Sequence, residues 1–110
     1  MASSNIIIII DSKLQDSTYI AHPGDTLQLT LQENRSTGYS WNFKGNLDQP
    51  TARVLELEYI PRMVGRPSTV VYSWNPLECG LCEMSCTYAR PWAQSDADLC
   101  IKFRVLIKEK

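Results

Sequence analysis

The chain has 110 residues, of which 44% are hydrophobic and 21% are charged, and its formal net charge is −1. This length fits a single domain spanning residues 1–110, and the hydrophobic fraction argues against a disordered chain. The near-neutral charge argues against a nucleic-acid partner, which usually requires a basic patch. A solvated strand face explains the basic residues near the end better: Lys102, Arg104, Lys108 and Lys110.

The first hydrophobic segment, residues 5–10, contains five consecutive isoleucines. It is too short to span a bilayer, which takes about 20 apolar residues, and no basic residue precedes it as in a signal peptide. We therefore expect a strand buried on both faces. We also expect a cytoplasmic protein without membrane contact, with a secreted or vesicular form as the alternative.

Further along the chain, apolar and polar residues alternate with period two, which is the signature of β-strands. The expected strands cover residues 27–31, 39–43, 52–60, 70–74, 81–88 and 101–107, with turns at 22–25, 45–50 and 75–80. About seven or eight short strands and no helix are predicted. Strands with one apolar face need a second layer, so we expect an all-β sandwich of antiparallel strands, with Trp41 and Trp74 in its core or on a sheet face.

The four cysteines, Cys79, Cys82, Cys86 and Cys100, suggest either disulfides or a metal site. Structural zinc sites favour four ligands in paired knuckles, and Cys82 and Cys86 share a strand face with Met84 and Tyr88, so apolar packing is favoured over metal. At ~3.3 Å per residue, Cys82 and Cys86 lie ~13 Å apart, beyond disulfide reach. Cys100 is out of phase with Ile101 and should face away from Cys86. We expect four free thiols, with a Cys79–Cys82 pair across Gly80 still conceivable.

Three connecting segments do not look like simple turns: residues 34–38, 63–68 and 89–92. The first places four polar, turn-forming residues directly before a strand that carries Trp41. The third contains a tryptophan, which is costly to expose unless it packs against something. In a sandwich with the immunoglobulin-like strand order these segments are the BC, DE and FG loops, which cluster at one end.

The sequences N-R-S-T-G-Y-S-W, V-G-R-P-S and T-Y-A-R-P-W occur in these segments in that order. Together they resemble the chagasin family of small protein inhibitors of papain-like cysteine proteases, whose motifs are roughly N-P-T-T-G-[YF]-x-W, G-x-G-G and R-P-W. The resemblance extends from P-G-D-T-L-Q-L-T-L to F-R-V-L-I-K. It implies an immunoglobulin-like sandwich that acts without a cofactor, is monomeric when free, and is a reversible, tight-binding competitive inhibitor rather than an enzyme.

The resemblance also implies how the three loops bind. The first enters the protease cleft near the catalytic cysteine, led by Thr37 and Gly38; the second lies along the unprimed side; the third rests on the primed side. A glycine permits close backbone approach, and a tryptophan beside a proline offers a large, rigid contact. The implied protease-binding residues are Asn34, Arg35, Ser36, Thr37, Gly38, Tyr39, Val64, Gly65, Arg66, Pro67, Ser68, Arg90, Pro91 and Trp92.

The chain departs from the family motifs at two places. Arg35 stands where the family usually has proline, which removes a rigid ring and adds a charge. Gly65-Arg66-Pro67-Ser68 stands where the family has G-x-G-G, and Pro67 lacks the N–H for strand-like pairing. Residues 34–36 also match an N-glycosylation acceptor, and a glycan there would obstruct the first loop.

Two other functions compete with inhibition. The single His22 lies in a turn and offers no Cys–His or Ser–His–Asp set, so catalysis is not expected. A generic immunoglobulin-like module for protein binding or adhesion is the alternative.

Overall fold

The computed structural model describes residues 5–33, 40–55, 68–89 and 99–109. These residues form eight strands: β1 (Ile7–Ile10), β2 (Asp16–Ala21), β3 (Thr26–Glu33), β4 (Ser40–Gly45), β5 (Thr51–Leu55), β6 (Ser68–Trp74), β7 (Gly80–Ala89) and β8 (Leu99–Ile107). No helix in this part of the chain is long and apolar enough to cross a membrane.

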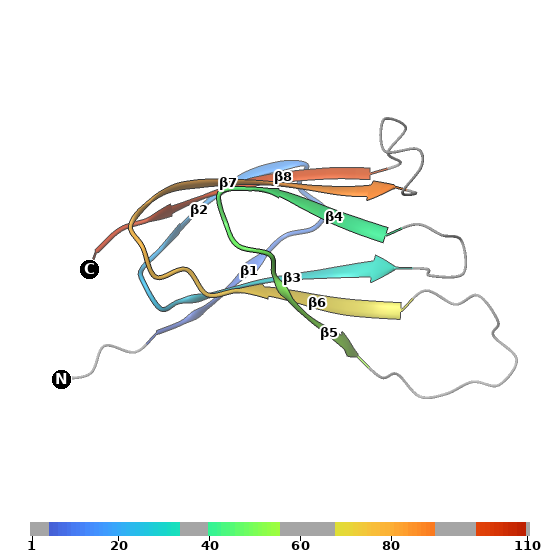
Figure 1. Ribbon diagram of the computed structural model, residues 1–110, viewed down its shortest axis with the longest axis horizontal. Coiled ribbons are helices and arrows are strands. Elements are labelled where there is room, and N and C mark those ends of the chain that lie inside the picture. Colours follow the sequence, from blue (N-terminus) through green and yellow to red (C-terminus); the bar gives the residue numbers. More distant parts are fainter. Residues whose placement is uncertain (1–4, 34–39, 56–67, 90–98, 110) are drawn as a thin grey trace, which may run out of the picture.

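The strands form two sheets of four, packed face to face (Figure 1). Sheet A has the order β1-β3-β6-β5, and sheet B has the order β2-β8-β7-β4. The predicted two-layer all-β sandwich of about eight strands is therefore confirmed. The turns predicted at residues 22–25, 45–50 and 75–80 lie between β2 and β3, β4 and β5, and β6 and β7.

The two sheets are mixed rather than purely antiparallel. β1 pairs with β3, and β2 pairs with β8, in parallel, whereas the other pairings are antiparallel. The chain passes from sheet A to sheet B between β1 and β2. Each of these strands thus reaches its neighbour by a crossover, and parallel pairing requires such a connection.

The core fills the space between the sheets with the alternate residues that the sequence pattern predicts. Sheet A contributes Leu27, Leu29, Leu31, Val70, Tyr72 and Trp74. Sheet B contributes Trp41, Phe43, Met84, Cys86, Ile101, Phe103, Val105 and Ile107. Trp41 and Trp74 are both buried, as expected. Their indole N–H groups donate to backbone carbonyls, of Gln32 at 3.0 Å and of Asp48 at 2.9 Å, respectively.

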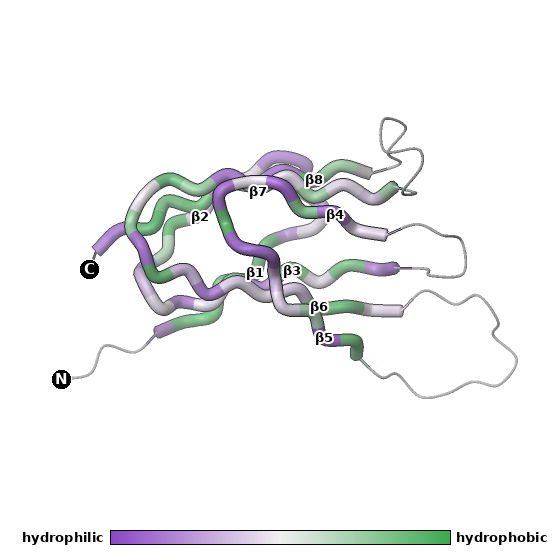
Figure 2. The backbone as a smooth tube through the Cα atoms, viewed as in Figure 1, coloured by the Kyte–Doolittle hydropathy of each residue, from purple (hydrophilic) through white to green (hydrophobic). Residues whose placement is uncertain are grey.

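The prediction that the isoleucine run is buried on both faces is wrong. β1 belongs to one sheet of a two-layer sandwich, so its inner face meets the core and its outer face meets solvent. Ile10 is 2% exposed and Ile8 packs partly against the core, but Ile9 is 64% exposed. The strand thus keeps an uncovered apolar face, and it is hydrophobic (green in Figure 2) along its length.

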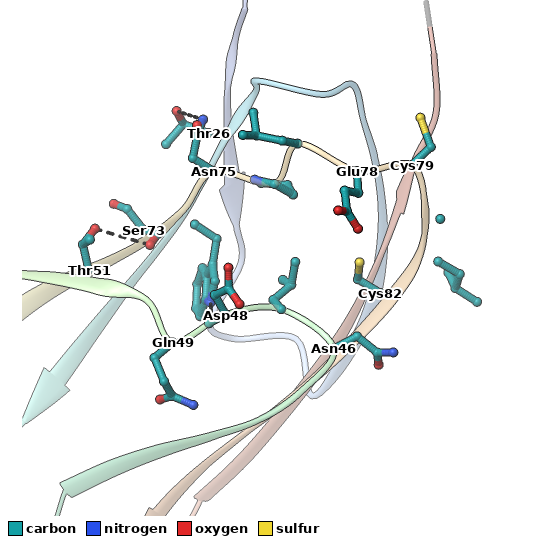
Figure 3. A pocket seen from close by; sticks show the side chains of 16 residues that line it. Thr26, Asn46, Asp48, Gln49, Thr51, Ser73, Asn75, Glu78, Cys79 and Cys82 are labelled. Carbon is teal, nitrogen blue, oxygen red and sulfur yellow. Dashed lines mark hydrogen bonds between the residues drawn. The ribbon is translucent and has the colours of Figure 1, made fainter.

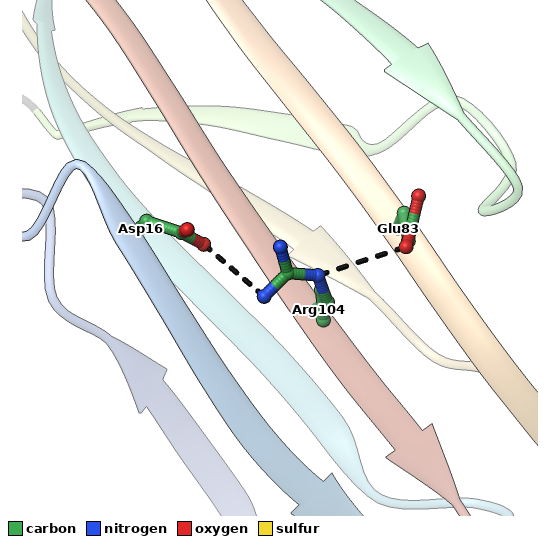
Figure 4. Close-up of polar contacts among 3 residues, drawn as sticks. All are labelled: Asp16, Glu83 and Arg104. Atoms are coloured by element: carbon green, nitrogen blue, oxygen red, sulfur yellow. Dashed lines mark ion pairs between the residues drawn. The ribbon is translucent and has the colours of Figure 1, made fainter.

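The outer face of sheet B carries a charged group that spans three strands (Figure 4). Arg104 of β8 pairs with Asp16 of β2 at 3.4 Å and with Glu83 of β7 at 3.6 Å. All three side chains are well exposed, and solvated pairs of this kind contribute little each to stability. The group marks this face as solvated surface.

Candidate functional site

Six strand ends meet at one end of the sandwich, which we call the loop end (right in Figure 1). β3, β5 and β7 end there, and β4, β6 and β8 begin there. The strand registers tie these ends together, since Glu33 pairs with Ser68, Ser40 with Ala89, and Tyr88 with Leu99. Residues 34–39, 56–67 and 90–98 are therefore each flanked by strand ends at the loop end, and they contain the three motif segments except for Ser68 and Ala89.

Ser68 is the one predicted binding residue that the structure describes. It is the first residue of β6 and is partly buried. The remaining predicted residues, at 34–39, 64–67 and 90–92, lie outside the described residues, so their roles in binding stay predictions.

The most distinctive side chain at the loop end is one that the sequence analysis did not single out. Glu33, the last residue of β3, is only 7% exposed although it carries a carboxylate. Its Oε1 accepts hydrogen bonds from the backbone N–H of Trp41 and from the hydroxyl of Tyr72, both at 3.4 Å. The only sequence signal was a glutamate at the end of an alternating strand, at a position where the pattern predicts an inward side chain.

The opposite end, which we call the far end, holds an open cleft of about 880 Å³ (Figure 3). It is lined by residues of the β4–β5 and β6–β7 turns, among them Asp48, Gln49, Glu78 and Cys79. Cys79 Sγ lies 3.5 Å from Glu109 Oε1 and makes a hydrogen bond to it. The cleft is separated from the motif-bearing strand ends by the length of the sandwich.

The described side chains do not form a recognisable catalytic or metal-binding set. Within the described ranges no group of three or more histidine, cysteine, aspartate or glutamate side chains could hold a metal ion. His22 Nδ1 is hydrogen-bonded to the backbone oxygen of Lys108 at 2.7 Å, which ties the β2–β3 turn to the end of β8. The imidazole thus takes part in the far-end structure.

The four cysteines are all free thiols in the structure, as predicted. Cys86 is buried opposite Ile101, whereas Cys100 is exposed opposite Thr87. These two cysteines therefore face opposite sides of sheet B, which confirms the argument from strand parity.

Comparison with known families shows to which family the chain belongs. The family model of the chagasin family peptidase inhibitors, I42, matches residues 20–105. The chain belongs to the chagasin family. Members of the chagasin family are peptidase inhibitors rather than enzymes, and the matched region includes every loop-end segment.

Individual relatives agree with this assignment to the chagasin family. Amoebiasin-2 of Entamoeba histolytica is 28% identical over 106 residues, which cover 93% of this chain and 86% of the relative. The crystal structure of the cysteine protease inhibitor EhICP2 from the same organism superposes with a TM-score of 0.78 at 26% identity, covering 97% of this chain and all of that one.

Two more distant structures share the fold. The solution structure of amebosin matches with a TM-score of 0.72 at 19% identity, covering 96% of this chain and all of that one. PbICP-C, solved in complex with falcipain-2, matches with a TM-score of 0.57 at 16% identity, covering 94% of this chain and 98% of that chain.

Proposed function

We propose that this protein is a reversible, competitive inhibitor of papain-like cysteine proteases that inserts the loop-end segments as a wedge into the active-site cleft. Membership of the chagasin family supports inhibition, and the relative EhICP2 is a cysteine protease inhibitor. PbICP-C was solved bound to falcipain-2, which supports the same class of target.

One observation carries the proposal: all three motif-bearing segments start and finish at the same end of a rigid sandwich. A protease cleft is long and narrow, and three segments presented side by side can contact it on both sides of the catalytic cysteine. Loops held by a rigid scaffold lose little freedom on docking, which favours tight binding. A segment that presents no well-aligned scissile carbonyl blocks the nucleophile without being cut.

The test is a titration of papain with the protein, using a fluorogenic peptide substrate. We expect stoichiometric inhibition that rising substrate concentration relieves and that dilution reverses, with the inhibitor recovered intact. Trypsin, a serine protease, serves as the control and should be unaffected. Absence of papain inhibition at micromolar protein, with circular dichroism showing a folded β-sandwich, would favour a generic binding module instead.

A further inference from the structure

The connection between β3 and β4 differs from the other two at the loop end because it joins different sheets. β5 pairs with β6, and β7 with β8, as antiparallel neighbours, so ladder hydrogen bonds hold together the strands on either side of residues 56–67 and 90–98. β3 belongs to sheet A and β4 to sheet B. No backbone ladder therefore fixes the distance between Glu33 and Ser40, the two strand ends that flank residues 34–39.

Side chains provide the link that the ladder does not. The indole Nε1–H of Trp41 donates to the backbone oxygen of Gln32 at 3.0 Å. The Glu33 carboxylate accepts from the Trp41 backbone N–H and, on the neighbouring strand β6, from Tyr72. The centroid of the Trp41 ring also lies 4.9 Å from the centroid of the Tyr88 ring of β7. These contacts connect strands that flank all three loop-end segments, and Glu33 lies where the two sheets meet.

The chemistry of this position favours a carboxylate specifically. A buried carboxylate is costly unless it is hydrogen-bonded, and hydrogen bonds to an ionised acceptor are stronger than those to a neutral one. Oε1 accepts from two donors, a backbone N–H and a tyrosine hydroxyl. A glutamine would keep the shape of the side chain, but its neutral amide oxygen would accept these hydrogen bonds more weakly than a carboxylate does.

We propose that Glu33 is a positioning residue of the inhibitory site: its buried carboxylate sets the spacing of the two strand ends that present residues 34–39 to the protease. This inference rests on the proposed function. Glu33 acts through the strand ends and does not itself contact the protease. Losing the link lets the two ends vary in position, so that binding must restrict them and the inhibition constant rises.

A matched control exists at the far end of the sandwich. Asp25 is a buried carboxylate, 1% exposed, whose oxygens accept from the backbone N–H groups of Ile6 at 3.0 Å and His22 at 2.9 Å. Glu33→Gln and Asp25→Asn therefore make the same chemical change at opposite ends. Both should lower the melting temperature, because both weaken hydrogen bonds to a buried carboxylate.

The experiment measures the inhibition constant for papain and the melting temperature of each full-length variant, at a temperature where all are folded. Glu33→Gln should raise the inhibition constant about tenfold or more, while Asp25→Asn leaves it unchanged. If Glu33→Gln does not fold, Tyr72→Phe removes one donor to the same carboxylate and should raise the constant about threefold. An unchanged constant in the folded loop-end variant, or an equal rise in Asp25→Asn, overturns the role of Glu33 while the proposed function stands. Wild-type protein that leaves papain fully active overturns both.

Discussion

Two of the three tryptophans of the chain lie in the core, and the third is predicted to bind the protease. Trp41 and Trp74 are buried, and each indole N–H has a carbonyl partner, which is the usual condition for burying this side chain. Trp92 follows Arg90 and Pro91 in the connection between β7 and β8. Its motif and its place between two strands of the loop end suit a docked anchor.

We expect Trp92→Ala to weaken papain inhibition by about 2 kcal/mol, roughly 30-fold, because buried aromatic anchors dominate interface energies. The melting temperature should change little. The measurements are the inhibition constant and thermal unfolding by circular dichroism. Leu77→Ala, which truncates a 70% exposed side chain at the far end, is the control and should alter neither. A Trp92→Ala protein that is strongly destabilised but inhibits normally when folded would assign Trp92 to the core.

Single residues also show where prediction from sequence stops. Glu33 ends an alternating strand and Asp25 lies in a predicted turn, yet both carboxylates are buried. Their burial depends on donors that are distant in the chain: Tyr72 is 39 positions from Glu33, and Ile6 is 19 positions from Asp25. Local pattern contains no information about such partners, so these two carboxylates emerged only from the structure.

At the scale of strands, alternation predicted the inward faces of β3, β6 and β8 correctly. It failed for β1 because a run of identical residues has no alternation and therefore does not distinguish a strand buried on one face from a strand buried on both. β2 was not identified, since Ile20 points outward and only small or partly buried residues such as Ala21 and Tyr19 face inward. Parallel pairing of these two strands was missed because it depends on a crossover between sheets.

The one-sided burial of β1 predicts unequal effects of identical substitutions along it. Ile10→Ala should reduce the free energy of unfolding by about 2–5 kcal/mol, as expected for truncating a buried isoleucine. Ile9→Ala, at a solvent-facing position one residue away, should change it by about 0.5 kcal/mol or less. Urea denaturation of both variants measures the difference. Equal losses would show that the outer face of β1 is covered in solution.

At the scale of the whole molecule, aromatic contacts connect the two ends through the core. Phe43 of sheet B lies 4.7 Å from Tyr72 and 5.6 Å from Trp74 of sheet A, measured between ring centroids, and Trp74 lies 5.5 Å from Phe103. These edge-to-face and tilted contacts pack the sheets against each other. The loop end is therefore supported by a core that extends from Trp74 near the far end to Trp41, so motif-bearing segments are attached to a rigid base.

The reactivity of the four cysteines can report on the rigidity of the core, because they lie at different depths in the sandwich. Cys79 and Cys100 are exposed, Cys82 is partly buried and Cys86 is buried. Burial, with a smaller effect of the nearby Cys100, raises the pKa of Cys86 from its ordinary value of 9.0 to about 12. Since the thiolate is the reactive form, Cys86 is protected both by its surroundings and by its protonation.

We expect an aromatic disulfide reagent at pH 8 to modify Cys79 and Cys100 quickly and Cys82 more slowly, and to reach Cys86 only when the whole sandwich opens. In denaturant without reductant the count should be four thiols. The protonated Cys86 thiol favours the folded state fully below about pH 9, and this contribution declines as the pH rises toward 12, so stability should fall across that window. Cys86→Ala should show a shallower fall than Cys100→Ala, its matched control on the outer face. Rapid modification of Cys86 in the native protein would mean that the two sheets separate far more readily than this core implies, and a rigid base for the loop end could no longer explain tight inhibition.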